Sequence, residues 1–110
     1  MLARRMSRVV ATIATTFLGT TAMAQADAPA PDPGAVDAGK GLYKSYCARC
    51  HGLNMVTSSA AVFDLRKFPK DEKPRFVDSV TKGKRAMPAW SGTLKESDID
   101  QLWAYVSAPR

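Results

Sequence analysis

One short run constrains this chain more than any other: Cys47-Ala48-Arg49-Cys50-His51. It contains both cysteines and the single histidine of the 110 residues. A Cys-x-x-Cys-His run is the attachment motif of c-type haem, in which each thiol forms a thioether with the porphyrin and the imidazole binds the iron. The motif therefore predicts one covalent haem c, attached through Cys47 and Cys50, with His51 as an axial ligand of the iron.

Three other uses of a Cys-x-x-Cys pair are possible. A structural zinc site needs four ligands, and the chain has no further cysteine or histidine to complete one. A thioredoxin-like redox pair belongs to a strand-rich α/β unit, and no stretch of this chain has a convincing strand pattern. A disulfide between Cys47 and Cys50 would leave His51 without a role.

Residues 1–26 have the features of a secretory signal peptide. Arg4, Arg5 and Arg8 precede an apolar stretch over residues 9–19, and two small-x-small cleavage sites follow it. The alternative is a retained membrane anchor, but the apolar run of about a dozen residues is shorter than the roughly 20 needed to span a bilayer. We therefore expect cleavage and a periplasmic location.

Removal of this segment changes the charge of the protein. Three of the 16 lysines and arginines lie in it and none of the 10 acids do, so the net charge falls from +6 to +3. This modest charge gives no support to nucleic-acid binding. Residues 27–36, rich in proline and alanine, read as a flexible leader before a domain over residues 37–110. A domain this small needs a cofactor or another staple to complete its core.

The periodicity of the domain predicts three to four short helices and an all-α fold. We expect helices over residues 37–49, 75–82 and from 97 to about 108, the last with Ser97 as its N-cap. Pro74 suits the first turn of the second helix and Gly83 its end.

Two glycines inside the first predicted helix, Gly39 and Gly41, indicate that another part of the backbone comes close to it. Between the first two helices, the irregular segment holds Phe63, Leu65 and Phe68, which we expect to close over the haem ring.

Counting the histidines and methionines of the chain reduces the candidates for the second axial ligand of the iron. With only one histidine, the sixth position of the iron holds a methionine, another weak ligand, water or nothing. Three of the five methionines belong to the predicted signal peptide, and Met55 follows His51 too closely to reach the opposite face. Met87 stands in a loop with Pro88 behind it, and we predict Met87 as the ligand, since His/Met ligation is usual in cytochromes c.

These residues together resemble a class I cytochrome c. The matching positions are Gly39, Tyr43, the Cys47 to His51 motif, Met87-Pro88 and Leu102-Trp103-Ala104-Tyr105. The resemblance implies an all-α class I cytochrome c fold around one haem, with Gly39 packed near Tyr105, and a bacterial protein whose haem is attached outside the cytoplasm.

A narrower resemblance points to the periplasmic cytochromes that accept electrons from quinoprotein (PQQ-dependent) alcohol and methanol dehydrogenases. It is carried by Gly52-Leu53-Asn54-Met55, Asp64-Leu65-Arg66-Lys67-Phe68-Pro69, Arg75-Phe76 and Leu102-Trp103-Ala104-Tyr105-Val106. It implies such a dehydrogenase as electron donor and a terminal oxidase or another cytochrome as acceptor.

We therefore expect a monomeric, periplasmic monohaem electron carrier that is not an enzyme. Lys82, Lys84 and Arg85 precede Met87 and form either a basic rim for an acidic partner or an ordinary solvated charge run. Two alternatives remain: a haem subunit of a larger dehydrogenase or oxidase, and a small haem enzyme or gas sensor with an open sixth site.

Overall fold

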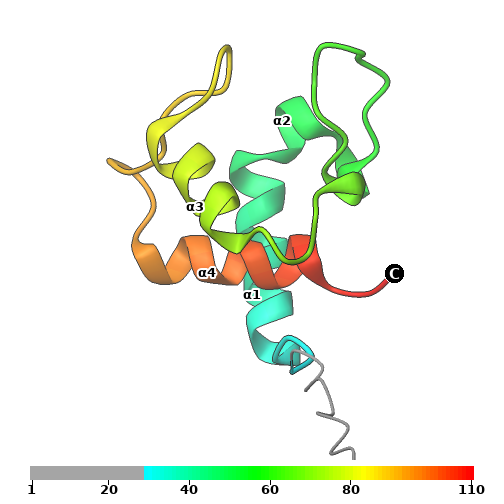
Figure 1. Ribbon diagram of the computed structural model, residues 1–110, viewed down its shortest axis with the longest axis vertical. Helices are drawn as coiled ribbons and strands as arrows, with labels where there is room; N and C mark the ends of the chain where they lie inside the picture. The colour runs from blue at the N-terminus through cyan, green and yellow to red at the C-terminus, as the bar shows by residue number, and fades with distance from the viewer. Residues whose placement is uncertain (1–28) are drawn as a thin grey trace, which may run out of the picture.

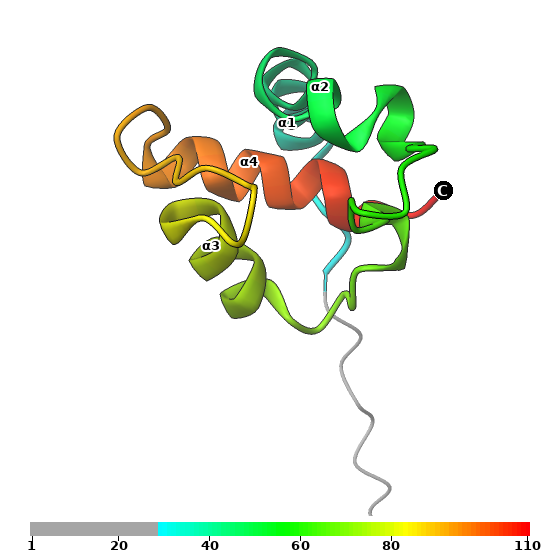
Figure 2. The same cartoon turned by 90° about the horizontal axis from the view of Figure 1, so that it is seen from above.

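Two helices that cross steeply, α1 and α4, form the centre of the fold (Figures 1 and 2). The computed structural model describes residues 29–110, so the predicted signal peptide lies outside the described range. Within it no element is a strand; the only pairing of that type is an isolated bridge between Lys84 and Met87. No helix in this part of the chain is long and apolar enough to cross a membrane. The elements are α1 (Pro33–Tyr46), α2 (Ala48–His51), the 3₁₀ turns η1 (Leu53–Met55) and η2 (Leu65–Lys67), α3 (Lys73–Lys82) and α4 (Glu96–Ser107).

The predicted all-α class is confirmed, and the α1–α4 crossing explains one of the two glycines. A Cβ built on Gly39 would stand 1.9 Å from the carbonyl oxygen of Gln101 and 3.0 Å from Cβ of Tyr105, so only glycine lets the helices meet here. One turn further on, the rings of Tyr43 and Tyr105 pack with their centroids 5.2 Å apart. The prediction for Gly41 was wrong: it is exposed, with no neighbouring atom within 4 Å of its Cβ position.

The predicted starts of the first and last helices were also wrong. α1 begins at Pro33 rather than at Asp37, because the Asp32 carboxylate accepts the N–H of Ala35 at 2.9 Å and proline suits the first turn. Residues 33–36, predicted as leader, are therefore helical.

α4 begins at Glu96, before the predicted cap Ser97. The Asp98 carboxylate folds back to accept the N–H of Lys95 at 2.9 Å, and this bond organises the first turn in place of the Ser97 hydroxyl. α3 fits its prediction closely: Pro74 lies in the first turn and Gly83 is the C-cap.

α3 packs beside α4. In Figure 1 the segments before and after α3 rise above α4, and α2 also lies above α4. Edge-to-face and tilted contacts join Phe68, Phe76 and Trp103, with centroids 5.2–5.9 Å apart. After α3 the chain is tied back to it, since the N–H of Trp90 donates to the carbonyl of Val80 at 2.9 Å. This tie fixes the base of the segment that carries Met87.

Candidate functional site

A cavity of about 540 Å³ brings together all four predicted site residues: Cys47, Cys50, His51 and Met87 line it. Its volume falls within the range of about 300–1,000 Å³ typical of cofactor sites. Most of its other walls are apolar or aromatic, including Phe63, Leu65 and Phe68 from the segment that we expected to close over a haem ring. The remaining lining residues are Tyr43, Tyr46, Ala60, Ala61, Val62, Arg75, Phe76, Ser79, Val80, Lys84, Arg85, Ala86, Pro88, Trp90, Leu102 and Val106.

The two cysteines and the histidine share one turn of backbone. α1 is interrupted at Cys47, whose carbonyl accepts the N–H groups of Cys50 at 3.1 Å and of His51 at 2.9 Å. This turn directs side chains three and four residues apart to the same side, the side of the cavity. Both thiols are free; Cys47 is partly buried and Cys50 exposed.

The surroundings of Cys47 are of low polarity. Burial, and secondly the neighbouring Cys50, raise the pKa of the Cys47 thiol to about 11. An apolar edge of this kind suits the vinyl side of a porphyrin.

His51 is held in the tautomer that a metal ligand needs. Its Nδ1 lies 3.2 Å from the carbonyl oxygen of Phe63. A carbonyl can only accept, so the proton of the neutral ring is on Nδ1 and the lone pair of Nε2 is left to bind a metal. Burial lowers the pKa of His51, although the bond to Phe63 acts in the opposite direction, and this favours the neutral, ligating form.

Met87 closes a tight two-residue turn. Its N–H and carbonyl exchange hydrogen bonds with Lys84 at 3.0 and 3.1 Å, and the side chain is partly buried against the cavity. The other methionine of the domain, Met55, is fully buried, its sulfur lies 3.7 Å from Nη2 of Arg110, and it does not line the cavity. Of the two, only Met87 can offer a thioether to a group bound in the cavity.

Reasoning from the sequence named Lys84 and Arg85 as part of a possible basic rim, but it missed Arg75 and the place of all three in the cavity lining. Arg75, Lys84 and Arg85 line the cavity, and no aspartate or glutamate does. A haem carries two propionate carboxylates, which the Lys84 and Arg85 cations fit, whereas Arg75 is already ion-paired with the Glu72 carboxylate outside the lining. Tyr46 and Trp90 also meet edge to face at the cavity, with centroids 5.5 Å apart. The apolar walls, the ligand-type side chains and the cationic lining together fit haem.

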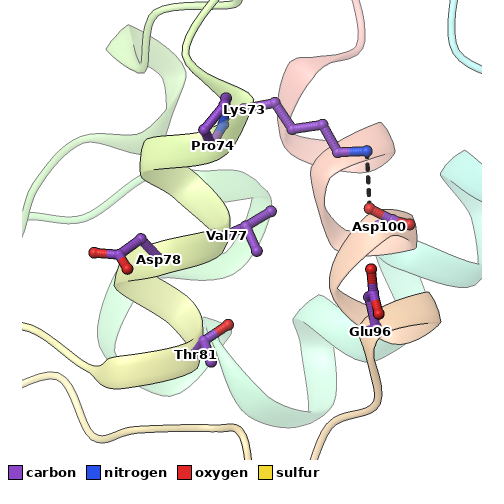
Figure 3. Close-up of a pocket in the computed structure, with 7 residues that line it drawn as sticks. All are labelled: Lys73, Pro74, Val77, Asp78, Thr81, Glu96 and Asp100. Carbon is purple, nitrogen blue, oxygen red and sulfur yellow. Dashed lines mark ion pairs between the residues drawn. The ribbon is translucent and has the colours of Figure 1, made fainter.

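A second depression, between α3 and α4, has a different character (Figure 3). Asp78, Glu96 and Asp100 line it, and Lys73 reaches across to Asp100 with an N–O distance of 2.8 Å. It contains no cysteine, histidine or methionine, and two of its charged side chains, Lys73 and Asp100, already pair with each other. Nothing in it resembles a haem pocket.

Comparison with known proteins agrees with the site. The sequence profile of the family described as cytochrome c oxidase, cbb3-type, subunit III matches residues 34–106. Cytochrome c6 of Microcystis aeruginosa is 39% identical over 74 residues, which cover 64% of this chain and 91% of that protein.

Two larger proteins match as well. Quinohemoprotein alcohol dehydrogenase ADH-IIG of Pseudomonas putida is 31% identical over 108 residues, covering 87% of this chain and 15% of the dehydrogenase. The cbb3-type cytochrome c oxidase subunit CcoP of Azospirillum brasilense is 33% identical over 84 residues, covering 68% of this chain and 28% of the subunit. The chain thus spans only a small part of each of these two relatives.

The profile match covers both crossing helices, the Cys-x-x-Cys-His turn and the Met87 turn, so the chain belongs to this cytochrome c family and is a class I monohaem c-type cytochrome, an electron-transfer protein with covalently bound haem c.

Proposed function

We propose that this protein is a periplasmic carrier of single electrons, with its haem attached through Cys47 and Cys50 and its iron held between His51 and Met87. The observation that carries the proposal is the convergence of these four side chains, from two separate turns, on one cavity. The bound iron supplies reversible one-electron chemistry. The chain supplies a neutral imidazole, a soft thioether that favours the ferrous state and raises the potential, and an apolar enclosure.

Ligation by Met87 also separates a carrier from a haem enzyme or gas sensor, since a filled sixth position leaves no place for a small ligand. We would produce the protein with a c-type maturation system and compare Met87→Leu with the matched control Met55→Leu. The wild type and the control should show the weak red absorption band of thioether-bound ferric haem and resist carbon monoxide. Met87→Leu should lose the band, bind carbon monoxide and have a lower midpoint potential. Rapid carbon monoxide binding by the wild type would favour the open-site alternative.

The donor that we propose is a quinoprotein alcohol dehydrogenase, and the acceptor a terminal oxidase or another cytochrome. The relatives include a quinohemoprotein alcohol dehydrogenase and an oxidase subunit, which supports partners of these two classes. The match to nearly all of a cytochrome c6 supports a separate monomeric carrier. The partial matches to the two larger proteins support the alternative, a haem subunit of a complex. Gel filtration of the native periplasmic protein distinguishes the two.

Docking of an acidic partner is proposed at Lys84 and Arg85, which are exposed and line the cavity. Lys82 does not line the cavity. Its charge is partly neutralised because it forms an ion pair with Asp78. Stopped-flow reduction by a purified quinoprotein alcohol dehydrogenase should slow as ionic strength rises. Lys84→Gln and Arg85→Gln should weaken that salt dependence more than the control Lys82→Gln does. Equal effects of the three substitutions would refute a specific docking role.

A further inference from the structure

The hydroxyl group of Tyr43 makes a short bond next to the haem-binding histidine. It donates to the carbonyl oxygen of Gly52, the residue after His51, at an O–O distance of 2.6 Å. Tyr43 is only 1% exposed, so the bond lies in surroundings of low polarity, where hydrogen bonds are stronger than in water. The two residues are nine positions apart, so the bond joins the interior of α1 to the end of α2.

Gly52 is held from both sides of its peptide unit. Its N–H donates to the carbonyl of Ala48 at 2.9 Å, and its carbonyl accepts from Tyr43 and, at 3.2 Å, from the N–H of Met55. The backbone that follows His51 therefore has little freedom to rotate.

The next residues show that this segment is constrained by its surroundings. Asn54 and Met55 have φ values of 55° and 62°, in the left-handed region that a bulky residue such as methionine seldom adopts. Such a conformation persists only where neighbouring contacts impose it. Met55 is fully buried, so the core supplies those contacts.

The ring of Tyr43 is fixed as well. The Tyr43 ring packs on the Tyr105 ring of α4. Tyr105 is in turn held by Arg110, whose guanidinium lies 4.9 Å from the centre of the Tyr105 ring and donates a hydrogen bond to the Tyr105 carbonyl at 2.9 Å. The hydroxyl of Tyr43 is thus a fixed point, set by the crossing of α1 and α4, against which Gly52 is held.

From this arrangement we infer that Tyr43 is a positioning residue for the axial histidine: through Gly52 it fixes the backbone of His51 so that Nδ1 keeps its bond to the Phe63 carbonyl. The inference rests on the proposed role of His51 as an iron ligand. A strong bond at Nδ1 makes the imidazole a more basic ligand, which stabilises ferric iron. Loss of the Tyr43 hydroxyl should loosen this bond and stabilise the ferrous state relative to the ferric state.

The test compares Tyr43→Phe with Tyr105→Phe in the haem-loaded protein. Both variants lose one hydroxyl from the same ring pair, but only Tyr43 bonds to Gly52. Since Met55 still donates to Gly52 in the variant, Tyr43→Phe should fold, which far-ultraviolet dichroism checks. We expect Tyr43→Phe to raise the midpoint potential, so that at a fixed applied potential the ratio of oxidised to reduced protein falls several-fold. We also expect it to alter the ¹⁵N chemical shift of the His51 ring. Tyr105→Phe should change neither.

A purely structural role would lower the melting temperature of Tyr43→Phe without moving the potential or the His51 shift, and that result would overturn the inference. If Tyr43→Phe yields no haem protein, the exchange of the Tyr43 hydroxyl proton with solvent is measured in the wild type instead. Slow exchange of a proton close to the Gly52 carbonyl supports the inference, and rapid exchange contradicts it. Failure of the proposed function is recognised separately, because the wild type itself would then lack the spectrum of histidine and methionine ligation.

Discussion

Gly83 lies against the backbone of Met87: a Cβ at position 83 would stand 2.6 Å from the Met87 carbonyl oxygen, and 2.8 Å from the N atom of Ala89. Gly83 also has a φ of 75°, which disfavours any side chain. The glycine therefore allows the turn to bring the thioether to the cavity.

We predict that Gly83→Ala displaces Met87 from its proposed position on the haem iron. The added methyl group collides with backbone atoms, which cannot move aside as a flexible side chain would, and the variant should be less stable by about 1–3 kcal/mol. The ferric protein should lose part of its red thioether band and begin to bind carbon monoxide. Gly92→Ala is the control, because nothing lies within 4 Å of that Cβ position. An unchanged band in Gly83→Ala would show that the turn tolerates the methyl group.

The crossing of α1 and α4 offers a second pair of matched substitutions. Gly39→Ala places a methyl group against the Gln101 carbonyl and should destabilise the protein by about 1–3 kcal/mol, or more if the helices cannot separate. Gly41→Ala meets no neighbour and should stabilise α1 by about 0.5–1 kcal/mol, since alanine is the better helix former. Denaturant unfolding measures both. Equal effects of the two substitutions would contradict the close approach at Gly39.

The buried hydroxyl group of Tyr43 should make the free energy of unfolding fall in alkaline solution. Burial, and after it the neighbouring Cys47 and Tyr105, raise its pKa from 10.0 to about 12. Between these values the native protein keeps a proton that the unfolded chain has lost, so rising pH favours unfolding. The contribution is fully present below pH 10 and disappears as the pH rises through about 12.

This pH effect is measured as the difference in unfolding free energy between the wild type and Tyr43→Phe. The wild type should lose stability relative to the variant as the pH increases above 10. A difference that stays constant over this range would mean that the Tyr43 hydroxyl is not effectively buried.

Removal of the haem should unfold the domain. The double variant Cys47→Ala/Cys50→Ala cannot attach it, and an empty cavity of about 540 Å³ removes contacts from most of the core. The free energy of folding of a domain is only about 5–15 kcal/mol, so a defect of this size leaves little stability. We expect no near-ultraviolet dichroism and no cooperative melting. Cys50→Ala, which retains one thioether, should stay folded; native-like melting of the double variant would contradict the prediction.

Local patterns in the sequence predicted what local contacts determine. The end of α3 at Gly83 follows from backbone preference, and the structure contains it. The first helix was predicted to run to Arg49, whereas α1 ends at Tyr46 and the separate turn α2 follows. The approach of Gly39 to Tyr105 was also predicted, although only through the resemblance to a known family.

Other features depend on contacts that no local pattern reveals. The start of α1 was predicted at Asp37, which can cap a helix, but in the fold the Asp32 carboxylate caps it instead. Arg75 joins Lys84 and Arg85 in lining the cavity because α3 and the following turn meet there.

The bond between His51 and Phe63 has a consequence for how this protein can evolve. The acceptor is a main-chain carbonyl, which every amino acid provides, so the electronic character of the imidazole does not depend on which residue occupies position 63. The Phe63 side chain is 50% exposed and also lines the cavity, so position 63 can change to another apolar residue. Surface chemistry beside the cavity can therefore be altered for a new redox partner while the main-chain hydrogen bond to the His51 ring is retained.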